Sequence, residues 1–541
     1  MKKYLRWYWQ QTDGIRARLL TRIVTGLIQV GLGLLLVWLS RRFIDVSIWK
    51  DDMARDIAVL FAVVALLVVM RQTVFYLTNI TDTLLQNAMR QRLFRLVMGR
   101  KMYAGTAALH SGDVCQRLEQ DVLAVSTIVT TVLPGMAVTL VQLVCAFLLM
   151  HFFDSWLAWS LLLSTPIVIV CAKYLSHKLK QMSLDIRKEE SDIQKTIQES
   201  VEQSLAIKVL QGENVMTGRL QEKQSRLEQL VRRRVKFTLI SRLLLGLSFS
   251  FGYFGAFVYG GIQLRNGVVT IGVMTAFLQL VSQIQTPILT LLGMIPQLIH
   301  STASVDRMAE VEHLEQEESL SSALSQTNGN IGIRLEGITY SYPDSQKTIL
   351  DSFTHDFKPG TSTALLGETG RGKTTLLRII SGLAIPQSGK VALYDINGKE
   401  MTGAEMRRHI VYVTQGNTLM SGTIRANLLL AKPEATEEEL NKALHTAVAD
   451  FVFHLPQGID TVIGEHAARL SEGQAQRIAI ARGLMKEGKV MLLDEISSAL
   501  DTETEGELLS RLSREYPGRT IVCVTHRPEA AKACGEILTL K

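Results

Sequence analysis

The chain has 541 residues, 47% hydrophobic and only 20% charged, which makes it too long for one ordinary domain and too apolar for a typical soluble protein. Its net charge of +7 does not indicate nucleic-acid binding, because the lysines and arginines gather between apolar runs and form no single basic stripe. The five cysteines show no C-x-x-C pair and no ligand spacing with histidine, which argues against a disulfide framework and a metal site.

Apolar runs dominate the first part of the chain, and each is long enough for a helix that crosses a bilayer, which needs roughly 20 residues. The predicted spans are 23–39, 57–77, 128–153, 157–175, 239–264 and 271–298. The basic segment 1–7 precedes a full-length span and is interpreted as an interfacial segment, with no pattern of a cleavable signal. We therefore expect a transmembrane domain at residues 1–304.

Two long polar stretches, 86–121 and 176–236, separate the spans and are rich in lysine and arginine. Because positively charged loops stay in the cytoplasm, both stretches and everything after the sixth span are predicted to be cytoplasmic. Arg41 and Arg42, on the outer side, are exceptions to this rule. Helical periodicity in both stretches, broken at 111–113 and 210–213, predicts extensions with a short cross-helix at each tip. Docking of these tips on a cytoplasmic domain is favoured over a solvated spacer.

Small and polar residues inside the spans leave two interpretations open. Gly252, Ala256 and Gly260 recur every fourth residue, which favours close helix packing over a role in binding a substrate. Glutamines at membrane depth either line a cavity or bond to neighbouring helices, and the sequence does not decide between these: Gln29, Gln142, Gln279 and Gln283.

The second half of the chain contains a predicted phosphate-binding loop. After a charged and serine-rich linker at 305–330, apolar β-like runs alternate with helical patterns from residue 331 to 541, which predicts an α/β layer around a largely parallel sheet. Residues 367–374 match G-x-x-x-x-G-K-[ST] between a predicted strand, 362–366, and a predicted helix, 376–380. Glycines let backbone N–H groups approach phosphate, and the lysine neutralises the outer phosphates. The segment therefore predicts ATP binding.

Two acids end a buried run, 490–493, and complete a hydrolytic site. Asp494 is expected to face Mg²⁺. Glu495 is expected to point toward the γ-phosphate, where it can orient and deprotonate water. Acids that merely end a strand are the less favoured interpretation once Lys373 is considered.

In this context residues 331–541 resemble the nucleotide-binding domain of an ATP-binding cassette (ABC) protein. Residues 470–474, Leu-Ser-Glu-Gly-Gln, resemble the signature loop of that family. Tyr342 matches the aromatic residue that stacks on adenine, Gln415 the glutamine that reaches Mg²⁺, and His526 the switch histidine at the γ-phosphate. The nucleotide-binding residues so assigned are Tyr342, Gly367, Glu368, Thr369, Gly370, Arg371, Gly372, Lys373, Thr374, Thr375 and Gln415.

The membrane half is similar to the exporter branch of the same family, so the implied fold is multidomain: an all-α six-helix transmembrane domain of the type 1 exporter kind, followed by an α/β P-loop NTPase domain. The resemblance implies Glu495 and His526 as catalytic residues, Thr374, Gln415 and Asp494 as Mg²⁺ ligands, and ATP and Mg²⁺ as cofactors. It also implies a second half-transporter chain, a homodimer being favoured over a heterodimer. Ser471, Gly473 and Gln474 would then contact ATP held by the partner.

The implied function is ATP-driven efflux of a small molecule, lipid or peptide by alternating access, in a bacterial inner membrane with the ATPase domain in the cytoplasm. The alternative is an ATP-gated channel or a regulatory subunit that hydrolyses ATP without pumping. Two departures from the family pattern stand out: Glu472 replaces the usual second glycine of the signature loop, and Ala467 and Arg469 alter the stretch before it. We interpret Glu472 as tolerated, and a heterodimer with a weaker site as the alternative.

Overall fold

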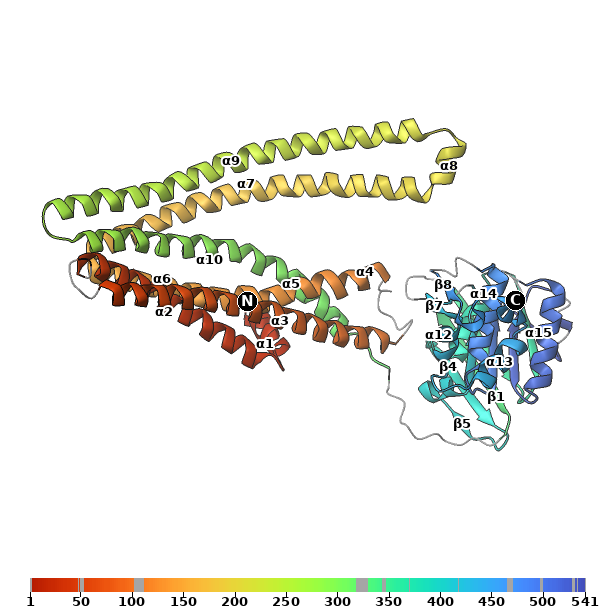
Figure 1. The fold of residues 1–541 in the computed structure, drawn as a ribbon. Helices are drawn as coiled ribbons and strands as arrows, with labels where there is room; N and C mark the ends of the chain where they lie inside the picture. The colour runs from red at the N-terminus through yellow and green to blue at the C-terminus, as the bar shows by residue number, and fades with distance from the viewer. Residues whose placement is uncertain are drawn as a thin grey trace. The chain divides into compact units, whose positions relative to one another are not determined.

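The chain forms two compact units, which we describe from a computed structural model (Figure 1). One unit comprises Met1–Phe94 and Val114–Val311, and the other comprises Arg95–Asp113 and Glu312–Lys541. The residues that the structure describes are 2–46, 48, 53–101, 111–317, 329–342, 347–368, 370–416, 418–464, 470–496, 500–527, 531–532 and 534–540.

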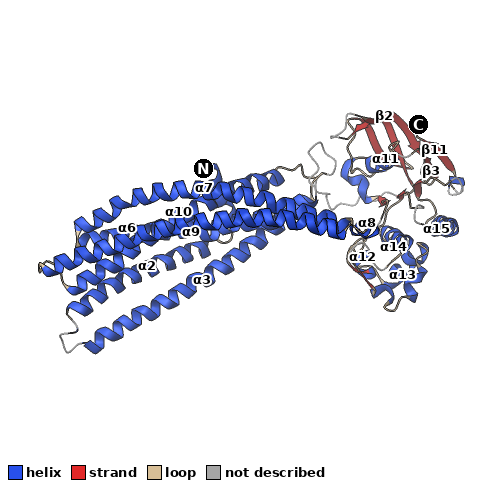
Figure 2. Cartoon of the chain, turned by 90° about the horizontal axis from the view of Figure 1, so that it is seen from above, coloured by secondary structure: helices blue, strands red, loops and turns tan. Residues whose placement is uncertain are grey.

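The first unit is built from long helices that run side by side (Figures 1 and 2). They are α1 (Lys2–Gln11), α2 (Arg16–Asp45), α3 (Met53–Met98), α4 (Ser111–Gln116), α5 (Val122–Thr127), α6 (Leu133–Phe153), α7 (Ser155–Glu202), α8 (Ser204–Val209), α9 (Glu213–Arg265) and α10 (Ile271–Glu312). Two π-helical turns, η2 (Arg117–Asp121) and η3 (Ile128–Val132), join α4, α5 and α6 into one continuous helix.

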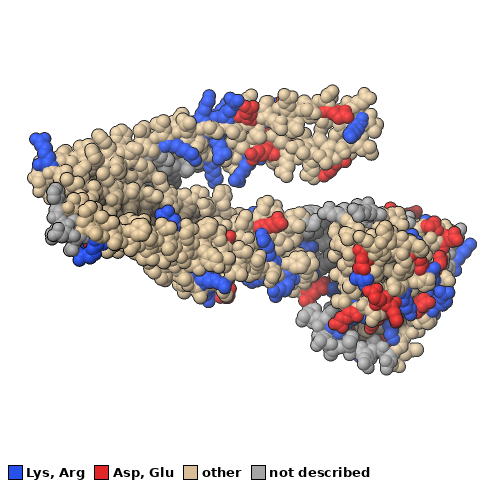
Figure 3. Space-filling view, in the orientation of Figure 1, with Lys and Arg blue, Asp and Glu red and all other residues tan. Residues whose placement is uncertain are grey.

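Five described helices are long and apolar enough to cross a membrane, and they coincide with the predicted first, second, third, fifth and sixth spans. The fourth predicted span lies in α7, where the side chains of 164–173 fall outside the described set. In Figure 3 the surface of the helical unit is largely uncharged away from its ends, while charges gather along α7 and α9 toward α8. The α-helical membrane architecture expected from the sequence is therefore present.

A break between α8 and α9 ends the second cytoplasmic extension. Gln211 adopts φ 53°, which places a residue other than glycine in the left-handed region, and α9 begins two residues later. On α8 and just after it, Leu205, Val209 and Leu210 are 79%, 75% and 79% exposed. Within the helical unit, this tip therefore presents an apolar surface.

The two outer arginines that break the charge rule are both held at the outer end of α2. The Arg41 guanidinium lies 4.7 Å from the Phe153 ring centroid and 3.6 Å from the Asp45 carboxylate, and Arg42 lies over Trp38. Asp45 in turn accepts hydrogen bonds from Gly272 N at 2.8 Å and from a threonine hydroxyl just before α10. These local contacts stabilise two positive charges on the outer side, where the topology rule predicts few lysines and arginines.

The small residues of α9 pack against α10, as the packing interpretation expects. Ala256 is 1% exposed, and a Cβ at Gly260 would come within 3.2 Å of Met274 Cγ. Of the four intramembrane glutamines, Gln283 donates to Gly33 O at 3.5 Å, which favours bonding between neighbouring helices at that position.

The second unit is an α/β domain with a parallel and an antiparallel sheet. Its main elements are β1 (Ile331–Ser341), β2 (Thr348–Phe357), β3 (Ser362–Leu366), α11 (Lys373–Ile380), β4 (Ser388–Asp395), β5 (Glu400–Met401), β6 (Ile410–Val413), β7 (Gly422–Thr423), α12 (Ile424–Leu429), α13 (Glu437–Thr446), β8 (Val462–Ile463), α14 (Glu472–Leu484), β9 (Val490–Asp494), α15 (Thr502–Glu515), β10 (Thr520–Val524) and β11 (Glu536–Thr539). The sheet orders are β11-β3-β10-β9-β6, all parallel, and β2-β1-β4-β5, all antiparallel.

Strand β9 separates two hydrophobic cores. Val490 and Leu492 point into the core shared with β1, β3 and α11, while Met491 and Leu493 point into the core shared with α12, α13 and α14. Alternate residues of a strand face opposite sides, so a strand that is apolar throughout must be covered on both faces. Figure 2 shows α12, α13 and α14 gathered as a helical layer beside the strands.

Candidate nucleotide site

The parallel sheet brings the sequence motifs to one edge. Strands β3, β10, β9 and β6 are neighbours in this order, and the carboxyl ends of parallel strands meet at the same edge of a sheet. The phosphate loop follows β3, His526 follows β10, Asp494 ends β9 with Glu495 after it, and Gln415 follows β6. Residues far apart in the sequence therefore converge at this edge.

The phosphate loop wraps around a buried lysine. Gly370 and Gly372 adopt φ 85° and 87°, and a Cβ at Gly372 would lie 2.7 Å from Ile349 Cγ2, so both backbone angle and space require glycine there. Lys373 is 4% exposed, and its Nζ donates to Gly367 O at 2.7 Å and to Glu368 O at 3.0 Å. Arg371 pairs with Glu368 at 3.3 Å, whereas Thr369 lies outside the described residues.

An oxygen-rich position lies beside this loop. Thr374 Oγ1 donates to Asp494 Oδ1 at 3.1 Å, and the Tyr412 hydroxyl donates to Asp494 Oδ2 at 3.1 Å. Asp494 is 1% exposed; burial raises the pKa of its carboxyl, and the two hydrogen bonds oppose that rise. Mg²⁺ prefers oxygen ligands and seldom uses more than one or two carboxylates, so this donor set fits it.

Glu495 leaves the strand in a strained backbone conformation. Its φ is 49°, a region that residues other than glycine seldom occupy and that occurs preferentially at active sites. Gln415 Nε2 lies 2.5 Å from Glu495 Oε2, and His526 Nε2 lies 3.0 Å from Glu495 Oε1. The carboxylate is thus contacted from two sides.

The tyrosine expected to stack on adenine is held by the helix that follows the phosphate loop. The Tyr342 hydroxyl lies 3.0 Å from Thr375 Oγ1 and accepts from Arg378 Nη1 at 3.1 Å. Its ring packs edge-on against Tyr340, with centroids 5.2 Å apart. The ring is therefore fixed relative to the phosphate loop.

The predicted signature residues form the start of α14. Ser471 Oγ accepts from Gln474 N at 3.2 Å, and Gln474 Oε1 accepts from Ser471 N at 3.0 Å, which makes a capping box. Glu472 is exposed in the first helical turn, where a negative charge is favourable. Gly473 follows it in the same turn. Ala467 and Arg469, the other departure from the family pattern, lie outside the described residues.

Sequence reasoning missed Tyr412. Its hydroxyl is one of the two donors to Asp494, and burial, together with the charge of Asp494, raises its pKa so that it stays protonated. A polar hydroxyl within the otherwise apolar strand 410–413, three residues before Gln415, is the signal that could have identified it.

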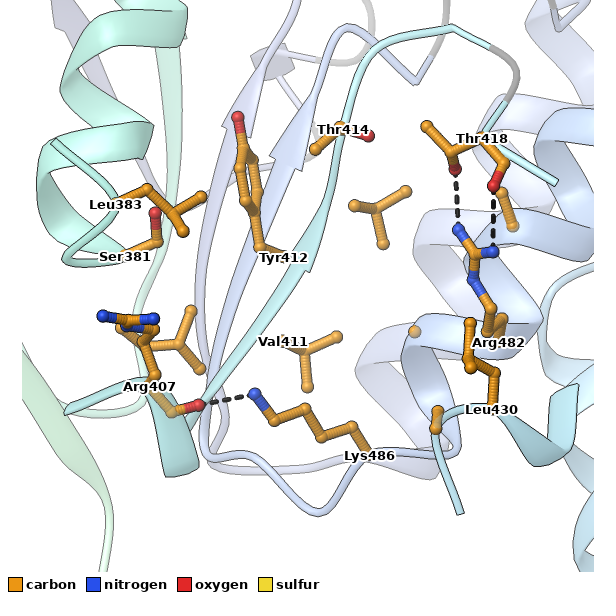
Figure 4. A pocket seen from close by; sticks show the side chains of 15 residues that line it. Ser381, Leu383, Arg407, Val411, Tyr412, Thr414, Thr418, Leu430, Arg482 and Lys486 are labelled. Carbon is orange, nitrogen blue, oxygen red and sulfur yellow. Dashed lines mark hydrogen bonds between the residues drawn. The ribbon is translucent and has the colours of Figure 1, made fainter. Parts of the chain in front are cut away.

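A cavity of about 320 Å³ lies next to the loop that carries Gln415 (Figure 4). Its walls come from β6, from the start of that loop and from α14, so it touches both the element before Gln415 and the helix that begins after Ser471. Arg482 donates to Thr418 O at 3.0 Å, and Lys486 Nζ donates to Arg407 O at 2.5 Å. Burial lowers the pKa of Arg482 and of Lys486.

Comparison with known proteins places both halves of the chain in one family. Residues 19–288 match the family model described as ABC transporter transmembrane region, and residues 350–498 match the model described as ABC transporter. The chain belongs to the ABC transporter family. Both expected parts, a membrane domain fused to an ATP-binding domain in that order, are confirmed by these matches.

Individual relatives of this ABC transporter agree. It is 28% identical to an ATP-dependent lipid A-core flippase of Bordetella avium over 435 residues, covering 78% of this chain and 71% of that protein. A protein of the same description from Desulfotalea psychrophila is 28% identical, with coverages of 80% and 75%. A bacterial Atm1-family ABC exporter solved with ATP bound has the same fold, with a TM-score of 0.80 at 20% identity over 98% of this chain and 94% of that one.

The family and the relatives together determine the general activity. The chain is a multi-pass membrane protein and an ATP hydrolase coupled to transport, of the exporter type. Its bacterial flippase relatives agree with a location in the inner membrane.

Proposed function

We propose that two copies of this chain form an exporter that moves an amphiphilic, lipid-like molecule across the membrane by alternating access. The proposal that ATP hydrolysis drives transport is supported by one observation. Gln415 and His526 both contact Glu495, beside the phosphate loop and Asp494. The amphiphilic cargo is inferred from the flippase relatives.

Each residue at the sheet edge receives a chemical role in this proposal. Lys373 and the backbone N–H groups of its loop hold the β- and γ-phosphates. Thr374, Asp494 and Gln415 would hold Mg²⁺, which would supply charge neutralisation on the phosphates. Glu495 would orient a water molecule and remove its proton, and His526, which contacts this carboxylate, would position it and contact the γ-phosphate.

The signature residues serve the ATP of the partner chain. Each chain has one phosphate loop and one signature loop, and in the family these face each other across a nucleotide. Ser471, at the N-terminus of α14, combines a hydroxyl with the positive end of a 13-residue helix, which suits a γ-phosphate. Two ATP molecules would therefore join two chains. A second copy of this chain is the simplest partner.

Replacing Glu472 with glycine should leave ATP hydrolysis nearly unchanged. The carboxylate is exposed in the first turn of α14, and the proposal places it in solvent, away from the phosphate that Ser471 contacts. We expect KM for ATP within about threefold of the parent and a loss of about 0.5–1 kcal/mol of stability, from the helix propensity of glycine and the lost dipole contact. Glu472→Gln is the matched control. A tenfold gain in ATP affinity in both variants would show that the carboxylate repels the nucleotide.

Coupling between the membrane domain and ATP turnover is proposed to depend on the apolar tip around α8. Within the helical unit, this tip exposes Leu205 and Val209. Leu205→Glu should abolish transport in vesicles while detergent-solubilised protein retains its basal ATPase rate. Leu184→Glu, also an exposed leucine but on the shaft of α7, should transport normally. Equal transport by both variants would contradict this route.

Proteoliposomes separate a pump from the channel alternative. With ATP supplied at the ATPase side, a pump accumulates a fluorescent lipid in one leaflet beyond its equilibrium distribution, whereas a channel only speeds equilibration. The expected result is ATP-dependent asymmetry that disappears when ATP is exhausted. Accumulation of a water-soluble dye with no effect on any lipid would reject the amphiphilic cargo and keep the pump.

A further inference from the structure

A second, mostly apolar cavity of about 350 Å³ lies in the helical unit, far along the chain from the nucleotide site. It is enclosed by α1, by the first turns of α2, and by the η3–α6 segment. Trp9 and Leu20, which flank it, are 60% and 59% exposed, so the cavity opens to the surroundings of the helices. Neither the ATPase chemistry nor the proposed coupling uses it.

The lining of this cavity changes from polar to apolar in one direction. Thr12 and Arg16 lie at one end, and Ile23, Leu133 and Pro134 lie further along α2 and α6. At about 1.5 Å per residue, Arg16 and Ile23 are about 10 Å apart along the axis of α2. Since α2 enters the membrane from its cytoplasmic end, the polar end lies at the interface and the apolar end lies within the hydrocarbon. A lipid of the cytoplasmic leaflet has this same polarity.

The polar end carries a pre-positioned cation. The Arg16 guanidinium lies 4.9 Å from the Trp9 ring centroid, its Nε donates to Thr12 Oγ1 at 3.2 Å, and its Nη2 pairs with Asp13 at 2.6 Å. Its side chain is 44% exposed, so it can contact a further group. Around it the sequence adds Lys2, Lys3, Arg6 and Arg18, against Asp13 as the acid in this stretch. The surroundings therefore favour an anion despite the pairing with Asp13.

The helix α1 that covers the cavity is also tied to the sixth span. The Tyr8 hydroxyl lies 2.6 Å from Ser301 Oγ, and the Tyr4 hydroxyl donates to Asp306 at 3.0 Å, both on α10. A molecule held between α1 and α2 would therefore brace α1 between the first and sixth spans.

We propose that this cavity binds one anionic phospholipid of the cytoplasmic leaflet as a resident lipid. One acyl chain lies along Leu19, Ile23 and Leu133, and the phosphate lies at Arg16. The acyl chain fills the apolar part of the cavity, and the cation selects an anionic headgroup over a zwitterionic one. The lipid stays bound during ATP turnover, which distinguishes it from transported cargo.

Native mass spectrometry of the full-length protein tests this site, after delipidation and titration with phosphatidylglycerol or phosphatidylcholine. The parent should retain one phosphatidylglycerol per chain. Leu133→Trp fills the cavity and should lose it, while Leu148→Trp, on the same helix but 57% exposed to the surroundings, should retain it. Arg16→Gln should keep a lipid but reduce the preference for phosphatidylglycerol about fivefold, the equivalent of one cation. Arg18→Gln, outside the lining, should reduce it less.

Several results would overturn the resident lipid. They are equal retention by Leu133→Trp and the parent, equal affinity of the parent for the two lipids, and release of the lipid when Mg²⁺ and ATP are added. If Leu133→Trp does not fold, Arg16→Gln still tests the proposal. A preference for phosphatidylglycerol that is the same in Arg16→Gln as in the parent would overturn it. All of these readouts measure binding, so they stand apart from whether the protein exports the cargo proposed above.

Discussion

Glu495→Gln is expected to lower kcat for ATP hydrolysis by about 10²–10⁴-fold while ATP still binds. The amide has the size of the carboxylate but cannot accept a proton from water. Gln415 and His526 contact the two oxygens of Glu495, so the carboxylate is positioned at the sheet edge. The measurement is steady-state ATPase rate together with equilibrium ATP binding on the same preparation.

A matched control for this variant is Glu503→Gln, which changes an exposed acid on α15 outside the sheet edge. It should hydrolyse ATP at the parental rate. Turnover by Glu495→Gln within about threefold of the parent, with the fold intact, would show that another group is the general base.

Lys373→Ala is expected to weaken ATP binding by about 30-fold or more. The ammonium is buried and held by two carbonyl groups of its own loop, so it is positioned before the phosphates arrive. Removing one partner of a buried charge pair costs about 2–5 kcal/mol, and each 1.4 kcal/mol is tenfold in affinity. Isothermal titration with ATP, with and without Mg²⁺, measures the loss directly.

Lys442→Ala is the control for that titration, because Lys442 is exposed on α13 and pairs with Glu515 at 3.7 Å. ATP affinity should be unaffected by it. If Lys373→Ala bound ATP as tightly as the parent, the phosphates would have to be held elsewhere.

Much of the nucleotide site could be predicted from the sequence because its chemistry sits at strand ends. Once 362–366 and 490–493 are recognised as strands of one parallel sheet, the shared edge at their carboxyl ends brings Lys373, Asp494 and Glu495 together. The hydrophobic runs likewise define the spans, because a bilayer imposes their length.

Other features could not be read from the pattern. The run 331–341 alternates apolar residues with polar ones, which indicates a strand but not the direction of its partners, so the antiparallel sheet around β1 was missed. The strained φ of Glu495 depends on how β9 meets Val524, whose carbonyl accepts from Glu495 N at 3.2 Å. Tyr412 was missed because a hydroxyl on an apolar strand does not reveal its partner.

The domain boundaries illustrate the same limit. Near residue 304 the composition does not distinguish helix from linker, because charged residues continue the periodicity of the sixth span. In the structure, α10 extends to Glu312, and β1 begins at Ile331. The boundaries at 304 and 330 therefore stay predictions from composition, and limited proteolysis would test them.

The central claim is that ATP is hydrolysed at a site shared by two chains. The ATPase rate per chain in nanodiscs that hold one copy, compared with nanodiscs that hold two, tests it most directly. We predict full turnover with two copies and a rate at least about 10²-fold lower with one, because a single chain lacks the Ser471 end of a partner helix at its γ-phosphate. Equal rates per chain in both particles would contradict the account.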